Sequence, residues 1–352
     1  MTLMKHDIFS YNIAEIPQLL AELNQPRFRS QQLLSWLYVK GARSYDEMTN
    51  LPASLRDKLE DAHPCVAPKI VDKQTSSDGT RKYVFEFFDG TRVEAVGIPS
   101  TDQKKNADPK HLTVCFSTQA GCAMECAFCA TGTEGLTRNL SSGEMVAQIT
   151  AVAQDFGCRV TNVVSMGQGE PFQNYDSCLD ALRFINSDKG LGIGARHITI
   201  STCGVLSGIS NLSKEPEQFT LAVSLHSAIQ HTRDALMPRC KSMKLDDLKS
   251  CLLDYIAQTG RRVSFEYLMI KNVNDTPEAL DAISHFCDGL LSHVNLIPIN
   301  SVDDSPFLPS TIATQKKWVA TLRSQGVETT IRNSRGSDID GACGQLKNKT
   351  KR

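Results

Sequence analysis

The sequence lacks two features that would assign a protein to a membrane or to a highly charged partner. No apolar run in the 352 residues approaches the roughly 20 residues that a membrane-spanning helix needs. The first residues, Met-Thr-Leu-Met-Lys-His-Asp, introduce charges before any apolar stretch forms, which is unlike a secretory signal. The formal net charge is only −1, so composition alone gives no reason to expect nucleic acid binding. We therefore expect a cytoplasmic protein without a membrane partner.

Cysteine, by contrast, is abundant, with twelve residues in the chain. A reducing compartment disfavours structural disulfides, so metal binding or catalysis becomes the more informative interpretation of this number. Seven of these residues show no motif spacing, and we expect them to be small core residues, as free cysteines usually are. They are Cys65, Cys158, Cys178, Cys203, Cys240, Cys251 and Cys287.

The chain divides into four segments by its patterns. Residues 1–62 are expected to form a small helical domain, with one helix from about Ser30 to Gly41 and another after Pro52. Residues 63–110 are expected to form a β extension and a polar linker that begins at 99. Within this segment, two Asp-Gly pairs flank a strand pattern that predicts a hairpin over 82–98. Residues 111–346 are expected to form the core, and residues 347–352 a basic tail.

In the core, short apolar strands alternate with helical stretches. Ser141 and Glu144 form a capping box that starts one of these helices, which should end at Gly157. Six βα units predict an α/β fold in which a parallel sheet curls toward a barrel, with the function at the carboxyl ends of the strands. A last alternation, Val327–Ile331, could add an edge strand. The six strands are expected at Leu112–Ser117, Asn162–Met166, His197–Ser201, Phe219–Leu225, Val263–Met269 and Val294–Pro298.

The strongest chemical signal is the spacing Cys122-x3-Cys126-x2-Cys129, which directly follows the first of these strands. Three thiolates within eight residues suit an iron–sulfur cluster, because soft sulfur ligands favour such clusters. A 4Fe-4S cluster has four irons, so three cysteines would leave one iron open to a small molecule. The alternative is a structural zinc site that takes a fourth ligand from elsewhere.

This spacing resembles that of the radical S-adenosylmethionine (SAM) superfamily, and further motifs resemble the RlmN/Cfr RNA adenine methyltransferases. These are Cys115-Phe-Ser-Thr-Gln-Ala-Gly-Cys122, Cys129-Ala-Thr-Gly132, Met166-Gly-Gln-Gly-Glu-Pro171, Ser224-Leu-His226 and Asp338-Ile-Asp-Gly-Ala-Cys-Gly-Gln-Leu346. The resemblance extends to the N-terminal helices. It implies a partial (β/α)6 radical SAM barrel with a small N-terminal helical domain and a β-hairpin segment. It also implies one 4Fe-4S cluster per chain and two SAM molecules per turnover, with 23S rRNA and tRNA as substrates and a flavodoxin-type electron donor. A monomer is the default expectation.

The same resemblance assigns roles to three residues. Cys343 becomes the methyl carrier, an S-methylcysteine in the catalytic cycle; otherwise it would be an inert bystander. Cys115 becomes the thiol that releases the product by forming a disulfide with Cys343; otherwise it would be a strand packing residue. Glu94 becomes a carboxylate that moves a proton at the base; otherwise it would be an exposed strand residue.

The residues that the resemblance implies for SAM binding all follow core strands. Gly169 and Glu170 lie in a Gly-x-Gly-Glu-Pro stretch, which by itself would indicate only a turn. The others are Ser201, Ser224, Leu225, His226 and Asn300. Two positions depart from the family pattern. Arg239 and Cys240 stand in a region where Asn and an aromatic residue are common, which puts local substrate contacts in doubt. Gln168 replaces a common Met, a change that we expect to be tolerated.

Arg332-Asn-Ser-Arg335-Gly336 and the N-terminal helix containing Trp36 resemble the RlmN type, which methylates adenine carbon 2. The Cfr type, which methylates carbon 8, is the nearest alternative. Two other functions remain open from the sequence: a zinc-stabilised RNA-binding module without catalysis, and a radical SAM activase that acts on a protein.

Overall fold

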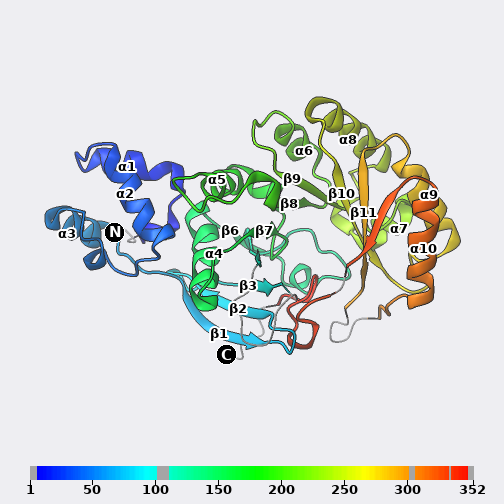
Figure 1. The fold of residues 1–352 in the computed structure, drawn as a ribbon, viewed down its shortest axis with the longest axis horizontal. Helices are drawn as coiled ribbons and strands as arrows, with labels where there is room; N and C mark the ends of the chain where they lie inside the picture. Colours follow the sequence, from blue (N-terminus) through cyan, green and yellow to red (C-terminus); the bar gives the residue numbers. More distant parts are fainter. Residues whose placement is uncertain (1–5, 101–110, 301–305, 333, 348–352) are drawn as a thin grey trace.

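The computed structural model describes residues 6–100, 111–300, 306–332 and 334–347. Residues 101–110 of the expected linker and 348–352 of the expected basic tail lie outside this range. A curved sheet runs through the middle of the molecule, with the N-terminal helices at one end and α6 to α10 at the other (Figure 1). Within the described residues, no helix combines the length and the apolar character that crossing a bilayer requires.

The sheet contains ten strands in the order β1-β2-β3-β4-β7-β8-β9-β10-β11-β12, and from β4 onward all neighbours are parallel. Because β1 and β12 lie at opposite ends of this order, the barrel is open. The expected α/β fold and the six core strands are confirmed, as is the edge strand β12. The parallel strands are β4 (Leu112–Cys115), β7 (Asn162–Ser165), β8 (Ile198–Thr202), β9 (Thr220–Ser224), β10 (Val263–Met269), β11 (Ser292–Pro298) and β12 (Glu328–Ile331).

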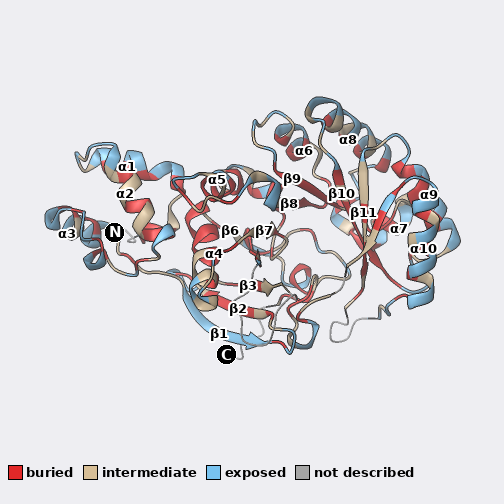
Figure 2. Cartoon of the chain, in the orientation of Figure 1, coloured by how far each residue is buried: buried red, intermediate tan, exposed pale blue. Residues whose placement is uncertain are grey.

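An antiparallel extension continues the sheet beyond β4. The predicted hairpin is present as β2 (Arg81–Glu86) and β3 (Arg92–Pro99), and β3 pairs with β4. The sequence did not predict β1 (Lys69–Thr75), which pairs with β2. Six of the seven residues of β1 are exposed, so the strand has no buried face to impose an alternation of apolar and polar residues (Figure 2).

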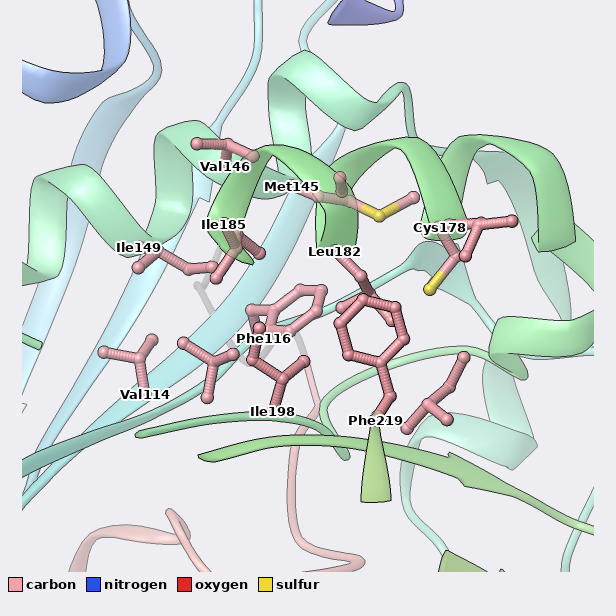
Figure 3. Packing of buried hydrophobic residues seen from close by; sticks show 14 of the residues in the cluster. Val114, Phe116, Met145, Val146, Ile149, Cys178, Leu182, Ile185, Ile198 and Phe219 are labelled. Atoms are coloured by element: carbon pink, nitrogen blue, oxygen red, sulfur yellow. The ribbon is translucent and has the colours of Figure 1, made fainter. Parts of the chain in front are cut away.

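Helices cover the outer face of the sheet. The predicted capping box starts α4: Ser141 Oγ accepts the Glu144 N–H at 3.0 Å, and Gly157 ends the helix with φ +66°. Figure 3 shows side chains of α4 and α5 packed over the sheet. Met145, Ile149, Leu182 and Ile185 come from the helices, and Val114 of β4, Phe116 directly after β4, and Ile198 of β8 come from the sheet side. The helices of the core are α4 (Ser142–Phe156), α5 (Tyr175–Asn186), α6 (Leu206–Leu212), α7 (Gln230–Leu236), α8 (Leu245–Thr259), α9 (Pro277–Cys287) and α10 (Ile312–Ser324).

The N-terminal region contains the helices α1 (Ile16–Glu22), α2 (Phe28–Leu34) and α3 (Ala53–Ala62), and it contacts α4 through the 3₁₀ helix Ile8–Ser10 and the turn Ser35–Val39. The helix expected to start near Ser30 begins at Phe28 and continues through a π-helical turn, Ser35–Val39. Thr150 Oγ1 of α4 donates to the Tyr38 carbonyl oxygen at 2.8 Å, which ties this turn to the barrel. The short 3₁₀ helices are Ile8–Ser10, Ile13–Glu15, Tyr45–Glu47, Thr131–Glu134, Pro171–Asn174, Ala195–His197, Pro238–Cys240 and Ser337–Ile339.

Candidate active site

A cavity opens at the carboxyl ends of the parallel strands, where the βα pattern predicts function. Its empty space, including the open mouth, is about 960 Å³. Five strands contribute a residue at or near their carboxyl ends, namely Ser165, Ser201, Ser224, Leu268 and Ile297. Residues from loops complete the wall. We call this space the cluster cavity, because Cys122, Cys126 and Cys129 all line it.

The loop that carries these three cysteines starts from a small hairpin that the sequence did not predict. Cys122 directly follows β5 (Gln119–Gly121), which pairs with β6 (Leu136–Asn139). Gly121 has φ +73°, and a Cβ at this position would lie 1.9 Å from the Gly135 carbonyl oxygen. The Cys122 N–H donates to that same oxygen at 2.9 Å. Only glycine fits this turn, which sets where the cysteine loop leaves the hairpin.

The loop suits a metal cluster. Burial raises the pKa of the Cys122 thiol to about 12 and also raises that of Cys126, so thiolates here need a nearby positive charge. Within the described residues, no three His, Cys, Asp or Glu side chains converge in the manner of ligands to a single metal ion. The three cysteines of a 4Fe-4S cluster bind three different irons, so they need not converge on one point. The donor set therefore fits such a cluster.

Gly169 and Glu170 lie beside this loop, as the resemblance predicts, and both line the cluster cavity. Gly169 has φ +104°, and a Cβ there would lie 2.6 Å from the Gln119 Cβ atom. The buried Glu170 carboxylate accepts the Phe172 N–H at 3.0 Å and the Cys203 N–H at 2.7 Å. Burial nevertheless raises the pKa of Glu170. These backbone hydrogen bonds orient the carboxylate at the edge of the cavity.

His226 presents a neutral imidazole to the cluster cavity. Its Nδ1 atom accepts the Leu268 N–H at 3.1 Å, so the proton of the neutral ring is on Nε2. Burial lowers the pKa of His226 to about 3, which keeps the ring uncharged at neutral pH. The ring packs edge-on against Phe128, with 4.6 Å between the centroids. His226 can therefore donate one hydrogen bond to a ligand without adding a charge.

The structure brings most, but not all, of the predicted SAM-binding residues to the cavity wall. Ser201 and Ser224 line it together with the residues above. The Leu225 side chain is instead fully buried in the main core. Asn300 is not among the described lining residues, although its Nδ2 atom is buried and has no hydrogen-bond partner within the described part of the chain.

A second cavity adjoins the first, and we call it the thiol cavity. Its wall includes both Cys115, the last residue of β4, and Cys343. Cys343 also lines the cluster cavity, so this residue lies where the two spaces meet. Burial, and after it the proximity of Cys343, raises the pKa of Cys115 to about 12. None of the twelve cysteines, all of which lie within the described residues, takes part in a disulfide bond.

The loop that carries Cys343 is attached to the segment that follows the cysteine motif. The Gly344 carbonyl oxygen accepts the Ala130 N–H at 2.8 Å, and the Leu346 carbonyl oxygen accepts Thr131 Oγ1 at 2.7 Å. These contacts join the C-terminal end of the barrel to its first βα loop. They explain how residues at opposite ends of the core sequence come to share a cavity.

Glu94 lies on β3 and is only 1 % exposed, so the alternative that it is an exposed strand residue is wrong. Burial raises its pKa to about 7, whereas Lys82 and the Lys347 N–H oppose this rise. Lys82 Nζ lies 3.6 Å from Glu94 Oε1, and Lys82 itself is 3 % exposed. Glu94 Oε2 has no hydrogen-bond partner within the described residues. A carboxylate with a pKa near neutrality and an unpaired oxygen is suited to accepting a proton.

Known proteins resemble this chain along nearly its full length. A "Probable dual-specificity RNA methyltransferase RlmN" from Alkaliphilus oremlandii is 41% identical over 346 residues, covering 98% of both chains. A relative of the same description from Bacillus velezensis is 43% identical and covers 97% of this chain and 93% of its own. The chain belongs to the RlmN family.

Family and structural comparisons agree with this membership. Residues 6–64 match the ribosomal RNA large subunit methyltransferase N-terminal domain, and residues 116–283 match the radical SAM superfamily. The crystal structure of a radical SAM methyltransferase from Sphaerobacter thermophilus superposes with a TM-score of 0.89 at 40% identity, covering 97% of this chain and 99% of that one. The predicted family, radical SAM fold, enzyme class and cofactors are confirmed.

The structure shows the surroundings of the two sites that depart from the RlmN family pattern, which are Arg239 with Cys240 and Gln168. Arg239 reaches back to the cysteine loop, where its Nη2 atom lies 2.5 Å from Glu125 Oε1, and Cys240 is buried beside the Cys203 carbonyl oxygen. The departure therefore adjoins the cluster loop. Gln168 is 1 % exposed, and neither side-chain amide atom has a hydrogen-bond partner within the described residues.

Sequence reasoning missed three residues that the structure places at this RlmN-type site. Cys203 lines the cluster cavity, although we expected it to be only a core residue. Glu266 lines the same cavity, and the available signal was a single carboxylate inside the apolar strand Val263–Met269. Arg332 lines both cavities; it was considered only as part of a motif.

Proposed function

We propose that this protein methylates carbon 2 of an adenosine in 23S rRNA and of an adenosine beside the anticodon of tRNA, with Cys343 as the methyl carrier. The observation that carries the proposal is the position of Cys343, which lines both the cavity of the cluster cysteines and the cavity of Cys115. The relatives' description as dual-specificity RNA methyltransferases supports both RNA classes.

Carbon 2 of adenine lies between two ring nitrogens and is not nucleophilic, so a direct polar transfer of a methyl group from SAM is blocked. In the proposed route, the Cys343 thiolate first takes the methyl group of one SAM molecule. Cys122, Cys126 and Cys129 would hold the 4Fe-4S cluster, which with a second SAM molecule would supply the radical that removes a hydrogen atom from this methyl group. The resulting methylene group then adds to the base.

Two residues of this chain complete the reaction. Glu94 accepts the proton that carbon 2 loses, as its pKa near 7 and its unpaired oxygen allow. The base is then bound to Cys343 through a thioether, and the unpaired electron left on the base would return to the 4Fe-4S cluster, which had given up one electron to cleave the second SAM molecule. The Cys115 thiolate attacks the Cys343 sulfur, the sulfur–carbon bond breaks, and its electron pair stays on the carbon, which takes up a proton to become the methyl product. The resulting Cys115–Cys343 disulfide must be reduced before the next cycle.

The decisive experiment uses anaerobically reconstituted protein with SAM, a reductant, and either 23S rRNA or tRNA. We expect nucleoside mass spectrometry to find 2-methyladenosine in both RNAs, and none with Cys343→Ala. Formation of 8-methyladenosine would instead indicate the Cfr type. SAM cleavage that needs no Cys343 and leaves both RNAs unmodified would favour a protein activase, and bound zinc without SAM cleavage would favour a non-catalytic module.

The remaining expectations belong to the same proposal. A flavodoxin-type protein supplies the electrons, the enzyme acts as a monomer, and it resides in the cytoplasm with its RNA substrates. Reconstitution of turnover with reduced flavodoxin and light scattering at micromolar concentration test the first two. Fractionation of cells expressing the tagged protein tests the third.

A further inference from the structure

The two cavities hold few positive charges near the thiols. Among the described lining residues, the only Lys or Arg in the cluster cavity is Arg332. The thiol cavity has Arg332 and Arg335. Arg335 is directed to another partner, because its Nη1 atom lies 3.6 Å from Asp78 Oδ2. Arg332 is therefore the cation that accompanies Cys343 in both spaces.

Arg332 is held in place by residues of the strands β10 and β11. It directly follows β12, and its N–H donates to the Leu296 carbonyl oxygen at 2.8 Å. Its Nη1 atom lies 3.7 Å from Glu266 Oε2, an ion pair in which the Arg332 side chain is 30% exposed and the Glu266 side chain only 8%. Glu266 is fixed in turn, since Asn295 Nδ2 donates to the same oxygen at 3.0 Å. The guanidinium is thus oriented by buried partners on two strands.

Resting on the function proposed above, we propose that Arg332 is a positioning residue that serves as a shared counter-ion, first for the Cys343 thiolate and then for the Cys115 thiolate. A cation close to a thiol favours the deprotonated, nucleophilic form. Both steps assigned to these cysteines require a thiolate, and both thiols border the cavity that Arg332 lines.

The order of the two steps follows from charge. In the first step, the Cys343 thiol loses its proton to solvent, its sulfur bonds to the SAM methyl carbon, and the methyl–sulfonium bond breaks to leave S-adenosylhomocysteine. Cys343 is then a thioether and can no longer carry a negative charge. Arg332 becomes available to Cys115, whose thiolate is needed only after the base has been attached. One fixed cation can therefore serve two nucleophiles in sequence.

The electrostatics of the described residues agree with this placement. The proximity of Cys343 is the largest cause of the raised pKa of Arg332, with burial opposing it and Glu266 and Cys115 adding to the rise. Arg332 in turn counteracts the rise that burial imposes on the pKa of Cys115. The other charged or titratable groups on the two cavity walls are Glu170, Cys203, His226, Glu266, Arg335 and the three cluster cysteines.

The test measures the reactivity of the two thiols and does not depend on RNA methylation. Holoenzyme is reconstituted anaerobically without SAM, and iodoacetamide alkylation of Cys343 and Cys115 is measured from pH 6 to 10 by peptide mass spectrometry. With Arg332→Met, we expect the alkylation rate at pH 7 to fall about tenfold or more at Cys343. Arg332→Lys should retain most of the rate. The matched control is Arg335→Met, which removes a cation from the same wall and should change the rate less than about twofold.

Superimposable pH profiles for the wild type and Arg332→Met would overturn the proposal. So would a weaker SAM affinity with unchanged profiles, because Arg332 would then be a SAM ligand. If Arg332→Met fails to fold or to retain its cluster, Arg332→Gln provides a second neutral side chain, with Arg332→Lys as the rescue. The outcome is independent of the proposed function: an Arg332-dependent thiol profile in an enzyme that leaves adenosine unmodified would contradict that function alone.

Discussion

The cluster cavity and the thiol cavity share a wall but differ in how they are built. The cluster cavity gathers the carboxyl ends of parallel strands and a cysteine loop, which is the arrangement that any βα barrel offers. The thiol cavity combines β4 and Ile98 of β3 with the segment that follows β12, and its wall also includes Met166 and Ile297, which line the cluster cavity as well. Cys343 and Arg332 belong to both. On the function proposed above, radical generation uses the part of the fold that is common to βα barrels, whereas methyl transfer and product release use residues added at its two ends.

The largest expected effect is the complete loss of the cluster and of SAM cleavage, which concerns the cluster cavity and not the thiol cavity. Cys122→Ala removes a ligand of the cluster cavity, so we expect loss of the iron–sulfur absorbance and no 5′-deoxyadenosine above background. Cys251→Ala is the control, because Cys251 is a half-buried free thiol that lines neither cavity. Iron analysis and chromatography of SAM products make the measurement. A Cys122→Ala protein that still cleaves SAM would remove the basis for the division.

We expect Cys115→Ala to block only the reaction step assigned to the thiol cavity, which is the release of the product. We expect it to retain its cluster and its SAM cleavage, yet to accumulate a covalent RNA–protein adduct, because the thioether forms but cannot be resolved. Denaturing gels with labelled RNA detect the adduct. Cys178→Ala serves as a control for loss of a buried thiol, since Cys178 lies in the main core. Free RNA alone, from a variant that still methylates at the wild-type rate, would contradict the assigned role of Cys115.

A smaller effect concerns pH. Because Glu94 must be ionised to accept a proton and burial raises its pKa to about 7, we expect the single-turnover rate of methylation to rise with pH through about 7. Lys82→Met removes the cation that favours the carboxylate, so the midpoint should move upward by about one unit or more.

Arg92→Met is the matched control for Lys82→Met. It breaks the ion pair of Arg92 with Glu86, which lies on the same hairpin but is partly exposed to solvent. We expect it to leave the midpoint of the pH profile within about 0.3 units, because screening by water weakens such pairs. An equal shift in both variants would mean that the hairpin as a whole, and not Lys82, sets the pKa of Glu94.

The smallest expected effect lies outside both cavities. Gln168→Met replaces two buried amide atoms that have no partner within the described residues, so we expect the free energy of unfolding to increase by about 1–2 kcal/mol with SAM cleavage unchanged. Urea denaturation checks this. Gln148→Met is the opposite control: Gln148 Oε1 accepts the Ser117 N–H at 3.0 Å and Nε2 donates to the Ser117 oxygen at 3.1 Å, so its loss should cost about 1–3 kcal/mol. Destabilisation by Gln168→Met would show that an ordered water satisfies the amide.

Much of the fold could be predicted because it depends on local patterns. The six core strands were apparent as short apolar runs between helical stretches, and α4 from its capping box and terminal glycine. The strand β1 could not be predicted, because an exposed edge strand needs no apolar face and is specified by its pairing with β2. The hairpin of β5 and β6 was missed for a similar reason, since its short strands give too few residues for a pattern.

For the site, the sequence determined the ligands and the family, and the tertiary structure decided the electrostatics. Cysteine spacing is local, so three thiols in one loop were readable without a fold. The burial of Glu94 beside Lys82, the proton position on His226 and the pairing of Arg332 with Glu266 all depend on strands that meet only after folding. The physical reason is that a covalent motif specifies which atoms can bind, whereas pKa values and counter-ions depend on the dielectric and the charges within a few ångströms, which only the assembled barrel provides.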